Sequence, residues 1–349
     1  MTRLPAALFC ATLALSAQQK PSPPKPSPPK PSPQEQADLE KALSDAGGNP
    51  AEYLRAIEKH LAKYPNSPRR PELERAAARA AVQAGDDGRT ILYGERVLAR
   101  DSSDLQVLES VTRALLKSDS PDNAERALRY ARRLETIIAQ TPAGGNKAEW
   151  QNQTDRRLAT ALRFEARATG NLGRFDEAQT LARRSFETYP NAESAREEAR
   201  WLERLGRQDD AVRALADAFT IPDPNATDAD RARDRGRMGE LYAKLHGSEA
   251  GLGDLVLAAY DRNVALLHAR ELRLRNTDPN AGIDDPMQFT LAGVDGAKLQ
   301  MADLKGKVLV LDFWATWCAP CRAQHPLYEQ VVQRFHDNPG VVFLSLDCD

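Results

Sequence analysis

Apolar residues recur at helical spacing through most of the chain and then change to a strand-like pattern near the C-terminus. From Gln36 to Arg275 they fall three or four positions apart, which predicts amphipathic helices that bury one face each. After Pro286 short continuous apolar runs replace this spacing, and they predict strands. We therefore expect helices over 36–275, a linker over 276–285 and an α/β segment over 286–349.

Part of the helical region repeats itself. The segment Gly173–Ala178, Gly-Arg-Phe-Asp-Glu-Ala, is echoed 33 residues later by Gly206–Ala211, and each copy is followed by Leu and Ala one helical turn apart. A period of 33 or 34 residues resembles tetratricopeptide (TPR) repeats, in which each helix pair is covered by the next. The resemblance implies an α-solenoid of three or four degenerate repeats. The alternative is a plain helical bundle, because most aromatic consensus positions are absent.

Two further features of the helical region are an irregular repeat spacing and a tryptophan. The register slips between Ala124 and Ala178, so we expect the loop at 141–145 to interrupt the stack. Trp201 lies within the apolar pattern and is interpreted as a core residue.

The N-terminus has the pattern of an export signal. Residues 1–17 carry Arg3, an apolar run from Leu4 to Leu15 and then two small residues, which is typical of a cleaved signal peptide. The run is too short for a membrane-spanning helix, so we expect no membrane span after processing. Residues 18–35 repeat Lys-Pro-Ser-Pro-Pro and predict an extended, disordered linker. The predicted location is the periplasm or another extracytoplasmic space.

The C-terminal pattern predicts a β-hairpin, a strand, a helix and a second strand. The hairpin would run from Phe289 to Met301 with a turn at Asp295-Gly296. Residues 308–314 are continuously apolar apart from Asp312, which predicts a central buried strand. A helix from Cys318 towards Phe335, with a kink at Pro326, and a strand over 341–346 complete the segment.

Two cysteines lie where this predicted helix begins. Cys318 would be near unpaired amides and the positive end of the helix dipole, which favour the thiolate that attacks disulfides. Cys321, one turn later, is placed to resolve the mixed disulfide that Cys318 forms. Pro320 suits the first turn because its missing amide hydrogen would be unpaired there. We interpret Cys318 and Cys321 as the catalytic pair.

The stretch from Phe289 to Leu346, with Phe313-Trp314-Ala315-Thr316-Trp317 before Cys-Ala-Pro-Cys, resembles the TlpA-like branch of the thioredoxin superfamily. That resemblance implies an extracytoplasmic thiol:disulfide oxidoreductase that acts on protein cysteines, with Trp317 and Pro320 as supporting residues. It also matches Asp312 to an aspartate held to help deprotonate the resolving cysteine, although Asp312 could equally be inert. The family fold continues beyond this point, so we expect a truncated thioredoxin-like fold from a truncated reading frame.

The balance of charged residues bears on which kinds of partner the protein binds. Lys and Arg total 48 against 50 Asp and Glu, a formal charge of −2, so nucleic acid is not an expected partner. We expect a protein thiol or disulfide as substrate, an unidentified protein on the helical repeats, and neither cofactor nor metal.

The cysteines also admit other interpretations. A zinc site from Cys318, Cys321, His325 and Cys348 is disfavoured because zinc sites usually pair two such cysteine motifs, and His325 is more typical of a surface or hydrogen-bonded histidine. A peroxiredoxin-like reading is disfavoured by the second cysteine of the pair. Cys348 is either a free thiol or half of an inter-chain disulfide. The main alternative function is an interaction scaffold whose redox segment is inactive.

Overall fold

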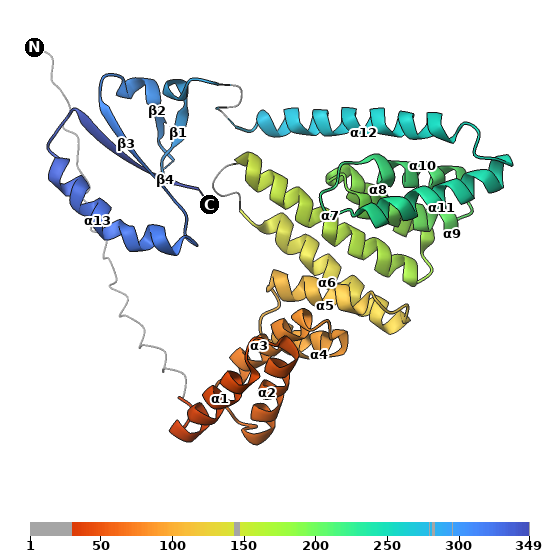
Figure 1. Cartoon of the computed structure of the whole chain (residues 1–349), viewed down its shortest axis with the longest axis horizontal. Coiled ribbons are helices and arrows are strands. Elements are labelled where there is room, and N and C mark those ends of the chain that lie inside the picture. The colour runs from red at the N-terminus through yellow and green to blue at the C-terminus, as the bar shows by residue number, and fades with distance from the viewer. Residues whose placement is uncertain (1–29, 143–146, 279, 281–282, 295, 349) are drawn as a thin grey trace, which may run out of the picture.

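Helices make up the first part of the structure and an α/β segment the last (Figure 1). A computed structural model describes residues 30–142, 147–278, 280, 283–294 and 296–348. The predicted signal peptide and most of the predicted Pro-rich linker lie outside them. In chain order the helices are α1 (Pro33–Ala46), α2 (Pro50–Lys63), α3 (Arg70–Gln83), α4 (Asp87–Leu98), α5 (Leu105–Leu115), α6 (Pro121–Gln140), α7 (Lys147–Asn171), α8 (Phe175–Thr188), α9 (Ala192–Arg204), α10 (Gln208–Thr220), α11 (Asp228–His246) and α12 (Leu252–Arg275).

Helix α1 begins within the Pro-rich sequence, three residues ahead of the expected helical start at Gln36. The Ser32 hydroxyl caps it by accepting a hydrogen bond from the Glu35 amide at 3.1 Å. Pro33 occupies the first turn, where a missing amide hydrogen removes no helical bond. The same device starts α2, whose Asn49 side chain accepts from the Ala51 amide at 2.9 Å ahead of Pro50.

Tight turns with glycine in the left-handed region join several helix pairs. Gly85, Gly173 and Gly206 have φ values of 69°, 82° and 74° and follow the ends of α3, α7 and α9. Only glycine adopts this conformation without a steric cost, and it closes the helix by turning the chain back. The repeated Gly-Arg sequence at 173 and 206 therefore marks equivalent turns.

The stack contains more helix pairs than the sequence predicted. Within the described part of the chain, α1 to α10 form five successive helix-turn-helix pairs, with α11 and α12 after them. The prediction of three or four repeats is therefore too low. The connection of the pair α5–α6, 116–120, carries no glycine, but the sequence repeat reaches this pair through Asp122-Asn123-Ala124 at the start of α6, which echoes Asp176-Glu177-Ala178.

The stack is not interrupted near residue 141, contrary to expectation. Part of that loop, 143–146, lies outside the described residues. Helices α6 and α7 on either side of it pack together, and Leu134 and Ile138 share one apolar core with Phe164 and Ala168. The extra residues between Ala124 and Ala178 instead lengthen the two helices, since α6 has 20 residues and α7 has 25.

Trp201 is buried between helix pairs, as predicted. Its side chain is 3% exposed and stacks on Phe175 with ring centroids 5.9 Å apart. A Cβ atom at Gly170 of α7 would overlap the indole ring, so only glycine leaves room for it. This close contact joins α7, α8 and α9.

The last helix, α12, packs back across α10 and α7. The Asn263 amide donates to the Thr220 hydroxyl at 2.9 Å, and Arg270 forms an ion pair with Asp155 at 3.0 Å. Leu252 and Ala259 are buried on the same side. The helix ends at Arg275, where the sequence predicted it to end.

The predicted order of the α/β segment is confirmed. It comprises η1 (Pro286–Gln288), β1 (Thr290–Ala292), β2 (Lys298–Gln300), η2 (Met301–Leu304), β3 (Val308–Trp314), α13 (Ala319–Phe335) and β4 (Val341–Asp347). Strands β1 and β2 pair antiparallel, and β3 pairs parallel with β4 from Val308–Val341 to Trp314–Asp347. The side chain of Asn280 ties the preceding linker to β1, since it accepts from the Thr290 amide at 2.7 Å.

Strand β3 is not buried as the sequence predicted. Within the described residues its ladder partner is β4 alone. Val308 and Phe313 are each 62% exposed, and Leu311 is exposed too. The continuous apolar run specified a strand correctly, but burial requires layers on both faces and strands on both edges. Among the described residues, no helix is long and apolar enough to cross a membrane.

We predict that Gly170→Ala destabilises the protein by about 1–3 kcal/mol, because the added methyl group overpacks the Trp201 contact. Urea unfolding followed by circular dichroism measures this. The matched control is Gly236→Ala in α11, where a Cβ meets no atom within 4 Å. That change should stabilise by about 0.5–1 kcal/mol through helix propensity. Equal effects of the two substitutions would contradict the assigned contact.

Candidate functional site

The cysteine pair lies where β3 gives way to α13. Ala315 is buried after the end of the strand, and its carbonyl accepts from the Cys318 amide at 3.1 Å. This bond closes a turn and brings Cys318 to the N-cap position of α13. The strand and the helix thus fix the position of the first sulfur.

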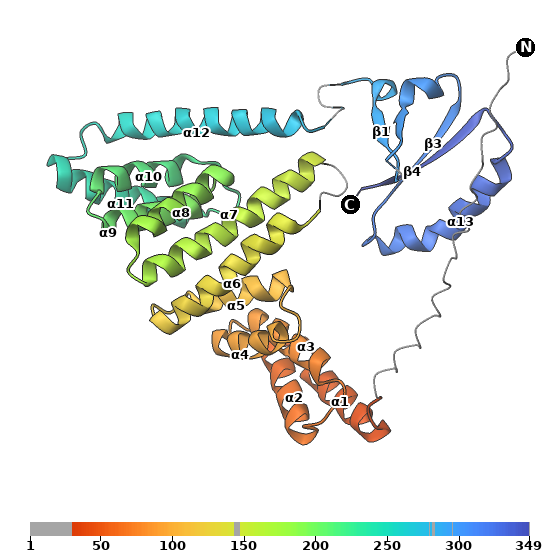
Figure 2. The same cartoon turned by 180° about the vertical axis from the view of Figure 1, so that it is seen from behind.

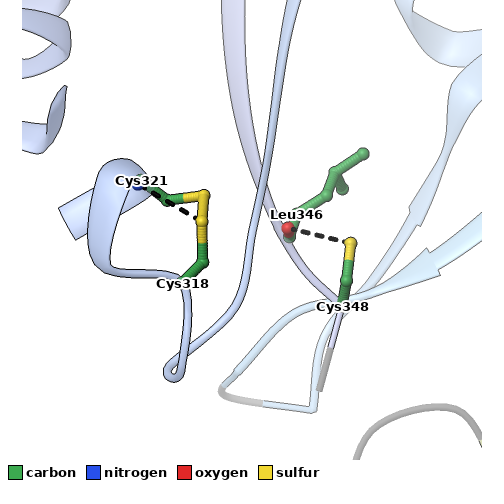
Figure 3. The surroundings of a disulfide bond; sticks show 4 residues. All are labelled: Cys318, Cys321, Leu346 and Cys348. Carbon is green, nitrogen blue, oxygen red and sulfur yellow. Dashed lines mark hydrogen bonds between the residues drawn. A yellow bond between two sulfur atoms is a disulfide. The ribbon is translucent and has the colours of Figure 1, made fainter.

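Cys318 and Cys321 form a disulfide across one helical turn, with their Cα atoms 5.3 Å apart (Figure 3). The Cys321 amide donates a hydrogen bond to the Cys318 sulfur at 3.2 Å. Sulfur thus takes the capping position that an oxygen usually occupies at a helix start. When the bond is reduced, this amide and the helix dipole stabilise a thiolate on Cys318.

The supporting residues surround this turn in different ways. Pro320 lies in the first turn of α13, where it leaves no amide hydrogen unpaired. Trp317 is 79% exposed beside the disulfide, so its ring is available to a partner. His325 lies on the surface of α13 with its ring edge against Trp314, at 5.4 Å between centroids.

Asp312 lies on β3, partly exposed and opposite Ser345 of β4. The Ser345 hydroxyl donates to its carboxylate at 3.4 Å. A role in proton transfer to Cys321 stays a prediction. Sequence reasoning missed Tyr328 of α13, whose pKa is raised by burial and then by the negative charge of Asp312. Its position seven residues after Cys321, two helical turns, was the available signal.

Cys348 follows β4 and belongs to neither strand nor helix. Its amide donates to the Trp314 carbonyl at 2.8 Å, which places it next to the end of β3. Its thiol is exposed and faces the Leu346 carbonyl oxygen at 3.7 Å (Figure 3). Pairing of Cys348 with another chain stays a prediction. In the part of the chain that the structure describes, no three His, Cys, Asp or Glu side chains converge as metal ligands.

The helical region has a polar cavity of about 460 Å³ between α8, α9, α10 and α12. Its walls combine two buried carboxyls with a larger number of arginines. Burial raises the pKa of both carboxyls, Glu198 and Asp217. The arginines are Arg183, Arg207, Arg213 and Arg262. Arg262 pairs with Asp217 at 2.9 Å, and Arg207 and Arg213 both pair with Asp210, a third carboxyl of the lining, at 2.9 and 3.2 Å.

Comparison with known proteins identifies the C-terminal segment. Residues 283–348 match the Redoxin family model. Thiol-disulfide oxidoreductase ResA of Bacillus thuringiensis is 36% identical over 61 residues, which are 18% of this chain and 35% of ResA. Thioredoxin-like protein YneN of Bacillus subtilis is 41% identical over 67 residues, 18% of this chain and 39% of YneN. The chain thus spans less than half the length of these relatives.

Solved structures resemble the helical region. A thermophilic TPR protein of Thermus thermophilus aligns with a TM-score of 0.37 and 18% identity, over 59% of this chain and 98% of that protein. A tetratricopeptide repeat protein of Parabacteroides merdae aligns with a TM-score of 0.34 and 12% identity, over 69% and 99%. The helix pairs and the 33-residue repeat themselves define the TPR-like region of this chain. A redoxin, thioredoxin-like segment with a Cys-x-x-Cys pair follows it.

After reduction, we predict that Cys318 is alkylated about five- to tenfold faster than Cys348 near neutral pH, because a helix start favours its thiolate. Limited iodoacetamide labelling followed by peptide mass spectrometry measures both thiols in one sample. Cys348 is the internal control, since it is exposed but lies outside a helix. Equal labelling of Cys318 and Cys348 would show that the helix start has no effect.

Proposed function

We propose that this protein is an extracytoplasmic thiol-disulfide oxidoreductase that acts on the cysteines of other proteins. The observation that carries the proposal is the hydrogen bond from the Cys321 amide to the Cys318 sulfur at the start of α13. It places one sulfur where the thiolate is stabilised and the second sulfur within bonding reach of it.

The reaction is an exchange of sulfur–sulfur bonds. The reduced Cys318 thiolate attacks a substrate disulfide, forms a mixed disulfide and releases one substrate thiolate. Cys321 then loses its proton and attacks the Cys318 sulfur, which releases the second substrate thiolate and closes the Cys318–Cys321 bond. Two electrons pass to the substrate, and an external dithiol must return them. If the Cys318–Cys321 pair starts oxidised and the substrate is a dithiol, every step runs in reverse and the substrate is oxidised.

The helical repeats are proposed to recruit a protein partner. Stacked helix pairs present an extended surface, which is the usual basis of binding in such arrays. The cavity between α8, α9, α10 and α12 adds polar groups to this surface, and a carboxylate of a partner would bind there by exchange with the carboxylates that its arginines already pair with. Recruitment would raise the local concentration of a substrate near Cys318.

Export is proposed from residues 1–17 and supported by one relative. The relative is the soluble secreted antigen MPT53 of Mycobacterium bovis, 38% identical over 73 residues, 21% of this chain and 40% of that protein. Disulfide exchange also suits an oxidising compartment.

We predict that the exported protein begins near Gln18, because the small residues Ser16 and Ala17 form the cleavage site. N-terminal sequencing of protein recovered outside the cytoplasm tests this. Substituting Arg for Leu13 in the apolar run should retain the chain in the cytoplasm, uncleaved. Recovery of the wild-type protein in the cytoplasm with residues 1–17 intact would contradict export.

The second candidate is an interaction scaffold with an inactive redox segment. The exposure of Val308, Leu311 and Phe313 on β3 favours it, because a strand with uncovered apolar side chains holds the following turn less firmly. In that case the repeats bind a protein while the cysteine pair turns nothing over.

For the enzyme, we predict that the purified full chain reduces insulin when dithiothreitol supplies electrons, at several times the rate of dithiothreitol alone. Cys318→Ser should abolish this gain, because the attacking sulfur is lost. Cys321→Ser that is reduced, freed of dithiothreitol and then mixed with insulin should instead accumulate a mixed disulfide, seen on non-reducing gels. Cys348→Ser is the control and should retain full activity. If the wild-type chain reduces insulin no faster than dithiothreitol alone, the enzyme proposal is wrong and the interaction scaffold is the remaining function.

A further inference from the structure

Helix α12 has apolar residues on two opposite sides, but the described structure covers only one of them. The inner side packs on α10 and α7 through Leu252, Ala259 and Asn263. Figures 1 and 2 both show α12 as the outermost helix of the helical region, with no other helix over its outer side. An array normally ends with a polar outer face, because no further repeat follows to cover it.

The outer side of α12 is apolar instead. Leu257 is 64% exposed, Tyr260 is 52% exposed, and Val264 and Leu272 are each 45% exposed. Their spacing of three, four and eight residues places them along one stripe of the helix. Exposed large apolar residues gathered in this way mark an interaction surface. We refer to these four residues as the outer stripe.

The two ends of the stripe are symmetric about the midpoint between Val264 and Ala265. Leu257 and Leu272 lie at equal distances from that midpoint and on the same side of the helix. Ala265 and Ala269 are exposed as well. If a second copy of α12 lies antiparallel across this midpoint, Leu257 meets Leu272 of the second copy. Val264 then lies next to Ala265 of the second copy near the centre of the contact, and Tyr260 lies at its edge.

The charges obey the same symmetry. Asp254 and Arg275 are equidistant from the midpoint, and so are Asp261 and His268. All four are exposed. An antiparallel pair therefore places each aspartate opposite a basic side chain of the second copy, and the two-fold symmetry repeats each of these pairings. A parallel pair would place Asp254 against Asp254 and Arg275 against Arg275, which is unfavourable.

From this self-complementarity we propose that the protein forms a homodimer through antiparallel packing of α12 on α12. Such an interface uses the same surface on both copies, so it closes at two subunits. The helix has 24 residues and is about 36 Å long. The two redoxin segments, which follow the C-terminal ends of α12, therefore leave the interface at opposite ends, and each carries its own cysteine pair.

The test is the molar mass of the full chain, measured by sedimentation equilibrium over a wide range of concentrations. The wild type should be a dimer in equilibrium with monomer. Leu257→Asp should weaken association about tenfold or more, because it removes the apolar contact at both ends of the interface. Far-UV circular dichroism should be unchanged, since the side chain is exposed.

Swapping the charges at positions 254 and 275 distinguishes this antiparallel geometry from non-specific apolar association. Asp254→Arg should weaken the dimer because the new arginine faces Arg275 of the second copy. Arg275→Asp should weaken it too, because the new aspartate faces Asp254 of the second copy. The double variant Asp254→Arg/Arg275→Asp should restore wild-type association. The matched control is Val82→Asp, which changes an exposed apolar residue of α3 and should leave association unchanged.

Three results would overturn the proposal. One is a wild-type chain that stays monomeric throughout, as expected if the outer stripe is covered within one chain. Another is a dimer lost in Leu327→Asp of α13 but retained in Leu257→Asp, which would place the interface on the redoxin segment. The third is a double charge variant that associates as weakly as the single variants.

Discussion

The structure depends on one constraint: each amphipathic element exposes an apolar face until a neighbour covers it. In the helical region the next helix pair provides that cover, so the core runs continuously from one pair to the next. Gly170 shows how closely the pairs approach, because its missing Cβ is the space that Trp201 fills. Where the neighbours end, the constraint is unmet, and the outer stripe of α12 and the exposed side of β3 are two of the results, beside exposed apolar residues of α13 such as Leu327.

These two uncovered surfaces differ in what they can do. The outer stripe of α12 has a leucine near each end and charges placed symmetrically about its middle, the basis of the proposed pairing with a second copy. The side chains of β3 carry no such pattern; they lie on a strand whose described ladder partner is β4 alone. An unpaired strand edge is a general site of association, whereas a self-complementary helix selects one partner and one orientation.

The chemistry of the chain rests on a short stretch between β3 and α13. Its turn is closed by the Ala315 carbonyl, and its helix start is capped by sulfur in place of oxygen. None of these contacts depends on the helical repeats. The repeats and the cysteine pair are therefore separate parts of one chain.

The sequence by itself determined the local elements and the site. Helical spacing, a 33-residue repeat and a Cys-Ala-Pro-Cys sequence after an apolar run specify helix pairs, a strand-to-helix junction and two cysteines one turn apart, because all of these depend on residues close together in the chain. Only the tertiary structure decided how many pairs stack, since degenerate copies of the repeat do not show where the array begins and ends. It also decided that the stack continues past residue 141 and that Phe313 is exposed. Burial depends on which segments lie alongside, and an apolar residue has the same local signature whether or not a neighbour covers it.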